Sequence, residues 1–360
     1  MDDFMITKNP FYVLGIESSA NKIGVGILKI MNENVELLAN ERKTYTPAPG
    51  AGVIPIDAAK HHRDVILELI DVSLQKSNLV IQDIDLYAYT KGPGMYQLLV
   101  VGCVVARTLA LYHNKPLVPV NHCVAHIEMG RFITGAKNPI VLYASGGNTQ
   151  IINRISGKTN KYKIFGETID VAVGNCFDKV ARALGLDNAP SPGFNIERQA
   201  ELNHEKKYIP LPYTIKGMDM SFSGILSTCL KLIKDFKSTN PSSAQFKKFI
   251  SEICFSLQET MFSILVEATE RCCSFVESNE VLIVGGVGCN LRLQEMIHKM
   301  ITQRGGTVYS MNEAYCIDNG AMIAYTGYLI FKHQSKYVTN LEDCYVTQRF
   351  RTDSVDITWK

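Results

Sequence analysis

The sequence has no C-x-x-C pair of cysteines, almost no net charge and only one tryptophan, Trp359. It does contain ten cysteines, but Cys272 and Cys273 are adjacent and most of the others lie in apolar segments. This distribution does not fit the disulfide framework of a small secreted domain. It predicts reduced, buried thiols in a cytosolic protein.

The charge balance excludes a strong general attraction to nucleic acid. Lys and Arg together number 37 and Asp and Glu 35, which gives a formal net charge of +2. A protein that binds RNA through its overall field carries a larger positive excess. We therefore expect an RNA substrate to require a local basic patch or basic partner proteins.

Targeting and membrane-spanning signals are also missing from the sequence. The first ten residues, MDDFMITKNP, contain two acids and resemble neither a secretory signal nor an Arg-rich transit peptide. From the sequence, we expect no apolar run that is long enough to cross a bilayer. The sequence thus predicts a soluble protein of the cytoplasm, with access to the nucleus left open and no membrane partner.

The length of 360 residues exceeds the size at which a single hydrophobic core keeps growing, so two lobes are expected. Hydrophobic residues make up 46% of the chain and charged residues 20%, which is typical of a globular protein. Strands alternate with helices along the chain, and this order predicts a largely parallel sheet.

Two hairpins with polar tips indicate an internal duplication. An apolar strand at residues 11–16 leads into a polar turn at 17–22, and the chain returns as a second strand. The same arrangement recurs about 130 residues later, where a strand at 139–144 precedes the tip at 145–149. Two unrelated polar hairpins in a large α/β protein would give the same pattern.

Periodicity and local breakers define the other expected elements. Asn121 is expected to cap a helix that carries His122 and His126. We expect further helices at 58–76, 96–112, 173–184, 291–304 and 321–331, an interrupted helical region at 244–278, and strands at 86–90, 116–120, 280–284 and 307–311.

His122 and His126 are the first candidate ligands for a metal ion. A spacing of four residues places both imidazoles on one face of a helix, where they can share an ion. A solvated or hydrogen-bonded pair would show the same spacing. Cys123 stands where a zinc protease motif requires Glu, so proteolysis is disfavoured. The adjacent His61 and His62 are interpreted as a surface feature, not as ligands.

Asp318 is the best candidate for a third ligand. It follows the strand expected at 307–311 and directly precedes an apolar helix. An acid at such a junction faces the cleft of an α/β protein. The same position would also suit a residue that caps the helix.

Two glycine-rich tips could bind an anion. The tip Ser145-Gly146-Gly147 and the stretch 285–288 expose backbone N–H groups without bulky side chains. Neither is a Walker loop, and tight turns use the same residues. Together they indicate a nucleotide held between two lobes. Asp178 and Glu197 stand near the turn that ends at Gly193, where they could contact a ligand.

Several longer motifs resemble one family when they are taken together. They are NHCVAHIEMGR (121–131), YASGGNTQ (143–150), FGETIDVAVGNCFDK (165–179), PSPGFNIE (190–197), GMDMSFSG (217–224), GGVGCNLRLQEM (285–296) and YCIDNGAMIAY (315–325). The family is tRNA threonylcarbamoyladenosine synthase, formerly called O-sialoglycoprotein endopeptidase. The similarity extends from about Tyr12 to Phe331 and favours the archaeal and eukaryotic branch, the catalytic subunit of the KEOPS complex.

The resemblance implies an α/β actin-like fold of the sugar kinase and heat-shock ATPase type, with two lobes around a central nucleotide cleft. We expect residues 11–130 and 318–345 to form the first lobe. Residues 131–317 would form the second lobe with helical insertions, and 1–10 and 346–360 would be tails.

The resemblance further implies an acyltransferase that acts on tRNA. Such an enzyme transfers the threonylcarbamoyl group of threonylcarbamoyl-AMP to N6 of the adenosine beside the anticodon, in tRNAs that read codons beginning with adenine. The implied partners are tRNA and the KEOPS subunits, namely a small atypical kinase, a dimerising subunit and a kinase-binding regulator. An actin-like ATPase or kinase and a non-catalytic scaffold subunit are the alternatives.

By motif position, the resemblance also implies the site. One divalent ion, iron or zinc, would be bound by His122, His126, Tyr143 and Asp318, and ATP or ADP could occupy the cleft. The residue that accepts the proton is not assigned. The implied substrate contacts are Tyr143, Ala144, Ser145, Gly146, Gly147, Asp178, Gly193, Glu197 and Asn290. Ala125 and Lys179 replace the usual Gly and Arg of the family, but no proposed ligand is lost.

Overall fold

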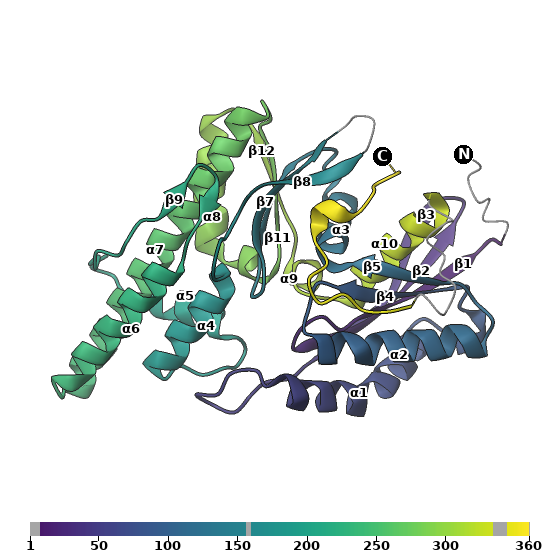
Figure 1. Ribbon diagram of the computed structural model, residues 1–360, viewed down its shortest axis with the longest axis horizontal. Helices are drawn as coiled ribbons and strands as arrows, with labels where there is room; N and C mark the ends of the chain where they lie inside the picture. Colours follow the sequence, from purple (N-terminus) through teal and green to yellow (C-terminus); the bar gives the residue numbers. More distant parts are fainter. Residues whose placement is uncertain (1–7, 156–159, 334–343, 360) are drawn as a thin grey trace.

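Two five-stranded sheets form the centre of the computed structural model, which describes residues 8–155, 160–333 and 344–359 (Figure 1). The first sheet has the strand order β3-β2-β1-β4-β5. Its antiparallel part is β1–β2–β3, and its parallel part is β1–β4–β5. The strands are β1 (Phe11–Glu17), β2 (Lys22–Met31), β3 (Asn34–Thr44), β4 (Leu86–Gly92) and β5 (Leu117–Asn121).

The second sheet repeats this topology, with the order β12-β11-β6-β7-β8. Again the first three strands in sequence are antiparallel, and the last two continue the sheet in parallel. The strands are β6 (Ile140–Ala144), β7 (Thr149–Ile155), β8 (Lys161–Glu167), β11 (Glu280–Val284) and β12 (Thr307–Ser310). The predicted duplication is therefore confirmed. The prediction of a largely parallel sheet is wrong, because each polar hairpin is extended by a third antiparallel strand.

Helices cover both faces of the first sheet. The helices α1 (Pro55–Lys76) and α2 (Tyr96–Tyr112) pack on one face and share a core with β1, β2 and β4. The opposite face contacts α10 (Gly320–His333) and α3 (His122–Thr134). Apolar side chains of α3 and α10 also join strands of the second sheet in one core, so α3 lies between the two sheets (Figure 1).

The second sheet carries most of the remaining helices, which pack into a separate core. These are α4 (Val173–Leu184), α5 (Pro192–Glu201), α6 (Ser223–Ser238), α7 (Ser243–Phe275) and α8 (Leu291–Gln303). The short elements are η1 (Ile81–Asp83), β9 (Ile215–Lys216), β10 (Asp219–Met220), η2 (Gly286–Cys289), α9 (Glu313–Cys316) and η5 (Thr352–Ser354).

The helix α7 differs from its prediction in two respects. It is continuous over 33 residues, because the segment contains neither proline nor glycine and a capping box at Ser242 and Gln245 starts it. Its length and mean hydropathy of 1.4 also meet those of a membrane span, contrary to our expectation for the sequence. However, 72% of that stretch is buried against the rest of the protein, as in the core helix of a globular domain.

The first hairpin and α10 are in direct backbone contact. A Cβ atom on Gly26 would lie 2.2 Å from the backbone nitrogen of Ala321, and one on Gly15 would lie 2.2 Å from that of Ala324. Only glycine allows so close an approach. Because Asp318 lies two residues before the start of α10, this contact fixes the position of Asp318 relative to the first sheet.

The C-terminal segment 344–359 packs against both sheets. The backbone nitrogen of Thr347 donates to Lys91 O at 2.7 Å, and that of Ile357 donates to Asn160 O at 2.9 Å. Trp359 is buried in the core that α3 and α10 share. The proposed lobe boundaries stay a prediction, and their residues 1–7 and 334–343 lie outside the described residues.

Candidate metal centre

The two histidines lie at the start of α3, immediately after β5. The Asn121 side chain accepts hydrogen bonds from the backbone of Cys123 at 2.9 Å and Val124 at 3.1 Å, so it caps the helix as predicted. The cap places His122 in the first helical turn and His126 in the second. Their ring centroids lie 4.7 Å apart, and both side chains are buried.

Asp318 joins this pair from a distant part of the sequence. Its Oδ1 lies 3.1 Å from Nε2 of His126 and 3.6 Å from Nε2 of His122. One potential ligand atom from each residue lies within 4.8 Å of the others. Atoms that bind one transition-metal ion are about 3–4 Å apart. Both distances from Asp318 Oδ1 to the histidines lie in this range, so these residues suit a metal ion. The neighbouring Asn319 accepts from Met322 N at 3.0 Å and takes the capping role that was open to Asp318.

A buried glutamate orients His122 from the side opposite Asp318. Glu17 Oε2 lies 3.0 Å from Nδ1 of His122 and also accepts from Thr90 Oγ1 at 2.7 Å. Ser19 N donates to the other carboxylate oxygen at 2.6 Å. The carboxylate favours a proton on Nδ1, which leaves the Nε2 lone pair directed toward Asp318. A carboxylate behind a ligating histidine is a recurrent feature of protein metal sites.

The surroundings of Asp318 and His126 favour the protonation states that bind a cation. Burial opposes ionisation of Asp318, but Lys22, His126 and His122 together hold its pKa far below the usual range. Burial lowers the pKa of His126, which therefore favours the neutral form that binds a metal. Burial also opposes a charged His122, yet Glu17 raises the pKa of His122 above its ordinary value. A bound cation would displace the proton that a charged His122 carries on Nε2, because a ligating imidazole is neutral.

Two buried polar atoms beside the cluster lack a hydrogen-bond partner in the described part of the chain: Nδ1 of His126 and the hydroxyl of Tyr143. Tyr143 lies in β6, with its ring centroid 5.4 Å from that of His126. Burial raises the pKa of Tyr143 well above its ordinary value. An unsatisfied buried polar group costs about 1–3 kcal/mol. These groups therefore fit a site that takes an additional ligand.

The tip after β6 presents an open backbone surface. Ser145 N donates to Asn148 O at 2.9 Å, and Asn148 N donates to Ser145 Oγ at 3.1 Å, which fixes the turn. Gly146 and Gly147 are exposed, with no atom within 4 Å of the Cβ that either would carry. Tyr143 and Ala144, by contrast, are fully buried. Of the predicted contacts 143–147, the two glycines are therefore the ones that face solvent most openly.

Asp178 on α4 belongs to the same electrostatic environment as Asp318. Burial raises the pKa of Asp178 to about 6, against the opposing charges of Arg182 and Lys22. Lys22 Nζ lies 3.7 Å from Oδ2 of Asp318. Asp178 is therefore a partly desolvated carboxylate whose charge depends on pH near neutrality.

The remaining predicted substrate contacts, Gly193, Glu197 and Asn290, belong to α5 and to the start of α8. The side chains of Glu197 and Asn290 already form hydrogen bonds within the protein. Glu197 Oε1 accepts from Leu291 N at 2.8 Å, and burial raises the pKa of Glu197. Asn290 caps α8 and donates to Gln258 Oε1 at 3.0 Å. Gly193 has open space around it. Their roles in substrate binding stay predictions.

Two outcomes differ from the sequence interpretation. His62 is fully buried and hydrogen-bonded to Ala20 O at 2.9 Å, so its interpretation as a surface residue is wrong. It packs α1 against the first hairpin turn. The sequence does not predict Glu17 as a site residue, because the polar turn that begins at Glu17 indicates only a hairpin tip.

Glu17→Gln is expected to weaken metal binding about 10- to 100-fold, because the neutral amide stabilises the Nδ1–H tautomer of His122 less than the charged carboxylate does. A competition titration with a coloured chelator measures this affinity. Glu36→Gln, which changes an exposed glutamate on β3, is the matched control and should leave the affinity unchanged. Equal affinities for wild type and Glu17→Gln would contradict the orienting role.

Comparison with known proteins identifies the family. The sequence model of the family described as tRNA N6-adenosine threonylcarbamoyltransferase matches residues 35–325. The chain belongs to this family. It is 57% identical over 347 residues to the tRNA N6-adenosine threonylcarbamoyltransferase of Encephalitozoon cuniculi, which covers 96% of this chain and 98% of that protein. The human protein of the same name is 53% identical over 348 residues, or 97% of this chain and 99% of its own length.

The family assignment confirms an enzyme of the transferase class and disfavours both the ATPase and the scaffold alternatives. Among solved structures, T. kodakarensis HypF matches with a TM-score of 0.57 at 14% identity, over 92% of this chain and 49% of that one. At this identity the similarity concerns the fold alone. The repeated sheets have the actin-like α/β fold, as predicted.

Proposed function

We propose that the protein transfers the threonylcarbamoyl group of threonylcarbamoyl-AMP to N6 of the adenosine beside the anticodon, in tRNAs that read codons beginning with adenine. One divalent ion bound by His122, His126 and Asp318, with Tyr143 beside it, would serve this reaction. The observation that carries the proposal is the buried His–His–Asp cluster with Glu17 behind it. The sequence similarity also supports the proposal, because relatives named for this activity are similar to this chain over nearly their whole length.

The ligand set is compatible with iron or zinc, because both accept mixed nitrogen and oxygen ligands. Three protein ligands would leave coordination positions open for a substrate, as catalytic sites require. When bound, the ion would polarise an oxygen of the donor and stabilise negative charge that develops during transfer.

The protein's own groups would bind and orient the two substrates. The donor is a mixed anhydride, so the N6 amine forms a bond to the carbamoyl carbon and the bond from that carbon to the AMP oxygen breaks. AMP leaves with that oxygen, and the amine releases one proton to the solvent. The exposed backbone of Gly146 and Gly147 is suited to an anion such as the donor's phosphate. An adenine amine is a weak nucleophile, so precise positioning would supply much of the rate. ATP or ADP could occupy the same cleft.

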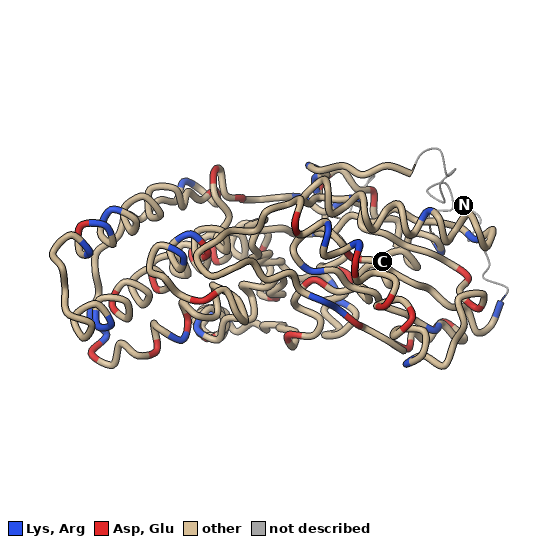
Figure 2. The backbone as a smooth tube through the Cα atoms, turned by 90° about the horizontal axis from the view of Figure 1, so that it is seen from below, with Lys and Arg blue, Asp and Glu red and all other residues tan. Residues whose placement is uncertain are grey.

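We propose tRNA and the KEOPS subunits, that is, the small atypical kinase, the dimerising subunit and the kinase-binding regulator, as partners in the cytoplasm and nucleus. Figure 2 shows Lys and Arg interspersed with Asp and Glu over both halves of the described chain. With a net charge of +2, the isolated subunit has little general attraction for RNA. Basic partners would supply part of the surface that binds tRNA.

Removal of the metal should abolish transfer. The protein would be treated with a chelator, dialysed, and assayed with its partners, tRNA and threonylcarbamoyl-AMP. Mass spectrometry of the nucleosides from digested tRNA measures the product. We expect activity to disappear and to return when iron or zinc is added. Full activity of the metal-free protein would contradict the role of the ion, and inactivity of every metal-loaded form would contradict the proposed reaction.

Asp178 should make stability depend on pH. Its pKa of about 6 in the folded protein exceeds that of an unfolded aspartate, so the folded state holds this proton more tightly. The wild type should therefore gain about 1 kcal/mol from this group as the pH falls from 8 to 5. Asp178→Asn should lack this gain, which thermal unfolding at both pH values measures.

The matched control is Asp187→Asn, which changes an exposed aspartate and should keep the wild-type pH dependence. The same variants separate stability from function. If the ionised Asp178 binds the donor, Asp178→Asn should raise the KM for threonylcarbamoyl-AMP. An identical pH dependence of stability in wild type and Asp178→Asn would show that this carboxylate titrates normally.

A further inference from the structure

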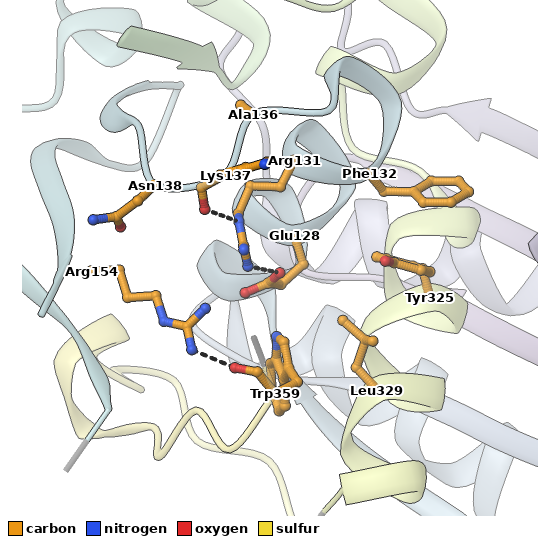
Figure 3. Close-up of a pocket in the computed structure, with 10 residues that line it drawn as sticks. All are labelled: Glu128, Arg131, Phe132, Ala136, Lys137, Asn138, Arg154, Tyr325, Leu329 and Trp359. Atoms are coloured by element: carbon orange, nitrogen blue, oxygen red, sulfur yellow. Dashed lines mark hydrogen bonds and ion pairs between the residues drawn. The ribbon is translucent and has the colours of Figure 1, made fainter. Parts of the chain in front are cut away.

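A second candidate binding site lies at the opposite end of α3 from the histidine pair. It is a pocket of about 470 Å³ between α3, β7, α10 and the C-terminal segment (Figure 3). Arg131, which lines it, lies nine residues after His122, or about 13 Å along the helix axis. Arg154, Lys137 and Trp359 also line this pocket, and none of them belongs to the proposed catalytic site.

Two buried N–H donors in the pocket have no hydrogen-bond partner among residues 8–155, 160–333 and 344–359: Nε of Arg154 and Nε1 of Trp359. The Trp359 side chain is only 2% exposed, and the nitrogen-bearing edge of its indole faces Glu128 and Arg131 in Figure 3. A second nitrogen of Arg154 donates to the backbone oxygen of Trp359, which fixes these two residues together. Both free groups can only donate, so the missing partner is a hydrogen-bond acceptor.

The charges around the pocket specify an anion. Three cationic residues line the pocket, Arg131, Lys137 and Arg154, and one carboxylate, that of Glu128, so the lining has a formal excess of two positive charges. Glu128 is already neutralised locally, because it accepts from Arg131 at 2.8 Å and from the Tyr162 hydroxyl at 2.6 Å. A phosphate carries close to two negative charges at neutral pH and offers several strong acceptor oxygens. Arginine binds such a group with paired, charge-assisted hydrogen bonds.

We propose that this pocket binds the phosphate group of a small molecule, separately from the metal site. The oxyanion would accept from Arg154 Nε and Trp359 Nε1, the two donors that otherwise lack a partner. Tyr325 and Leu329 form a less polar wall of the pocket, against which the organic part of a phosphate ester would pack. Free inorganic phosphate and a phosphate ester share the binding chemistry and differ in their use of this wall.

The fluorescence of Trp359 would report binding, because Trp359 is the only tryptophan in the chain and lines the pocket. The full-length protein would be titrated with sodium phosphate and, separately, with glycerol phosphate, at constant ionic strength kept with sodium chloride. We expect a saturable change in tryptophan emission below about 10 mM ligand. Tighter binding of the ester would identify an organic phosphate as the ligand, and equal affinities would identify inorganic phosphate.

Two variants test the residues, and a third is the control. Arg154→Gln and Lys137→Gln should each raise the apparent Kd for phosphate about tenfold or more. Lys163→Gln, which changes an exposed lysine on β8, should leave it unchanged. Lys137 is exposed, so its replacement keeps the fold even if Arg154→Gln disturbs the C-terminal segment. The absence of a saturable response in wild type, or an equal response in Lys137→Gln, Arg154→Gln and wild type, would overturn the proposal.

Discussion

His126→Ala is expected to lose its bound metal and at least about 100-fold in threonylcarbamoyl transfer, while the protein remains folded. His126 is the central member of the cluster, since it contacts Asp318, His122 and Tyr143. Its removal leaves two protein ligands, and the cleft would lose the ion that stabilises charge during transfer. Transfer is measured with the partners present, and metal content is measured on the same preparation.

The control for His126→Ala is His298→Ala, which removes an exposed histidine of α8. It should keep both the metal and the activity. Circular dichroism and the thermal midpoint establish whether each variant is folded. A folded His126→Ala protein that modifies tRNA at the wild-type rate would show that the cluster is not needed for catalysis.

Gly26→Ala should have the largest effect on stability, a loss of about 3 kcal/mol or more. The added methyl group would lie 2.2 Å from the Ala321 backbone nitrogen, so β2 and α10 must separate. No side-chain rotation can relieve this overlap, because the opposing atoms belong to the helix backbone. The movement of α10 would also displace Asp318 from the histidines, so metal affinity should fall together with the thermal midpoint.

The control for Gly26→Ala is Gly224→Ala, because Gly224 has space for an added methyl group. Gly224 lies in the first turn of α6 and has no atom within 4 Å of the position of an added Cβ. Gly224→Ala should leave stability unchanged or raise it slightly, because alanine favours helix by up to about 1 kcal/mol. If Gly26→Ala were as stable as Gly224→Ala, the close packing of α10 on the first hairpin would be wrong.

Local signals in the sequence predicted the elements that have strong local patterns. The bounds of α2, α4 and β11 agree with their predictions, since apolar periodicity and flanking breakers are properties of neighbouring residues. The strands β3 and β8 were not predicted. Both are edge strands with mixed, partly exposed side chains, so neither shows the alternation or the apolar run of a buried strand.

The same distinction applies to the site. The spacing of His122 and His126 is local, and Asp318 was predicted from its position between a strand and a helix. The contact of Glu17 with His122 spans 105 residues and exists because β1 and β5 flank β4 in the first sheet. Composition and periodicity do not contain this sheet order. The equivalence of the two duplicated hairpins was the one signal that pointed to the first polar turn.

Anomalous X-ray diffraction from crystals of the metal-loaded protein would show whether His122, His126 and Asp318 bind the catalytic ion. Data collected on both sides of the iron and zinc absorption edges locate the ion and identify the element. We expect one strong anomalous peak per chain, within bonding distance of His122 Nε2, His126 and an Asp318 carboxylate oxygen. An active, metal-loaded protein whose anomalous peak lies elsewhere, with none at this cluster, would contradict this expectation.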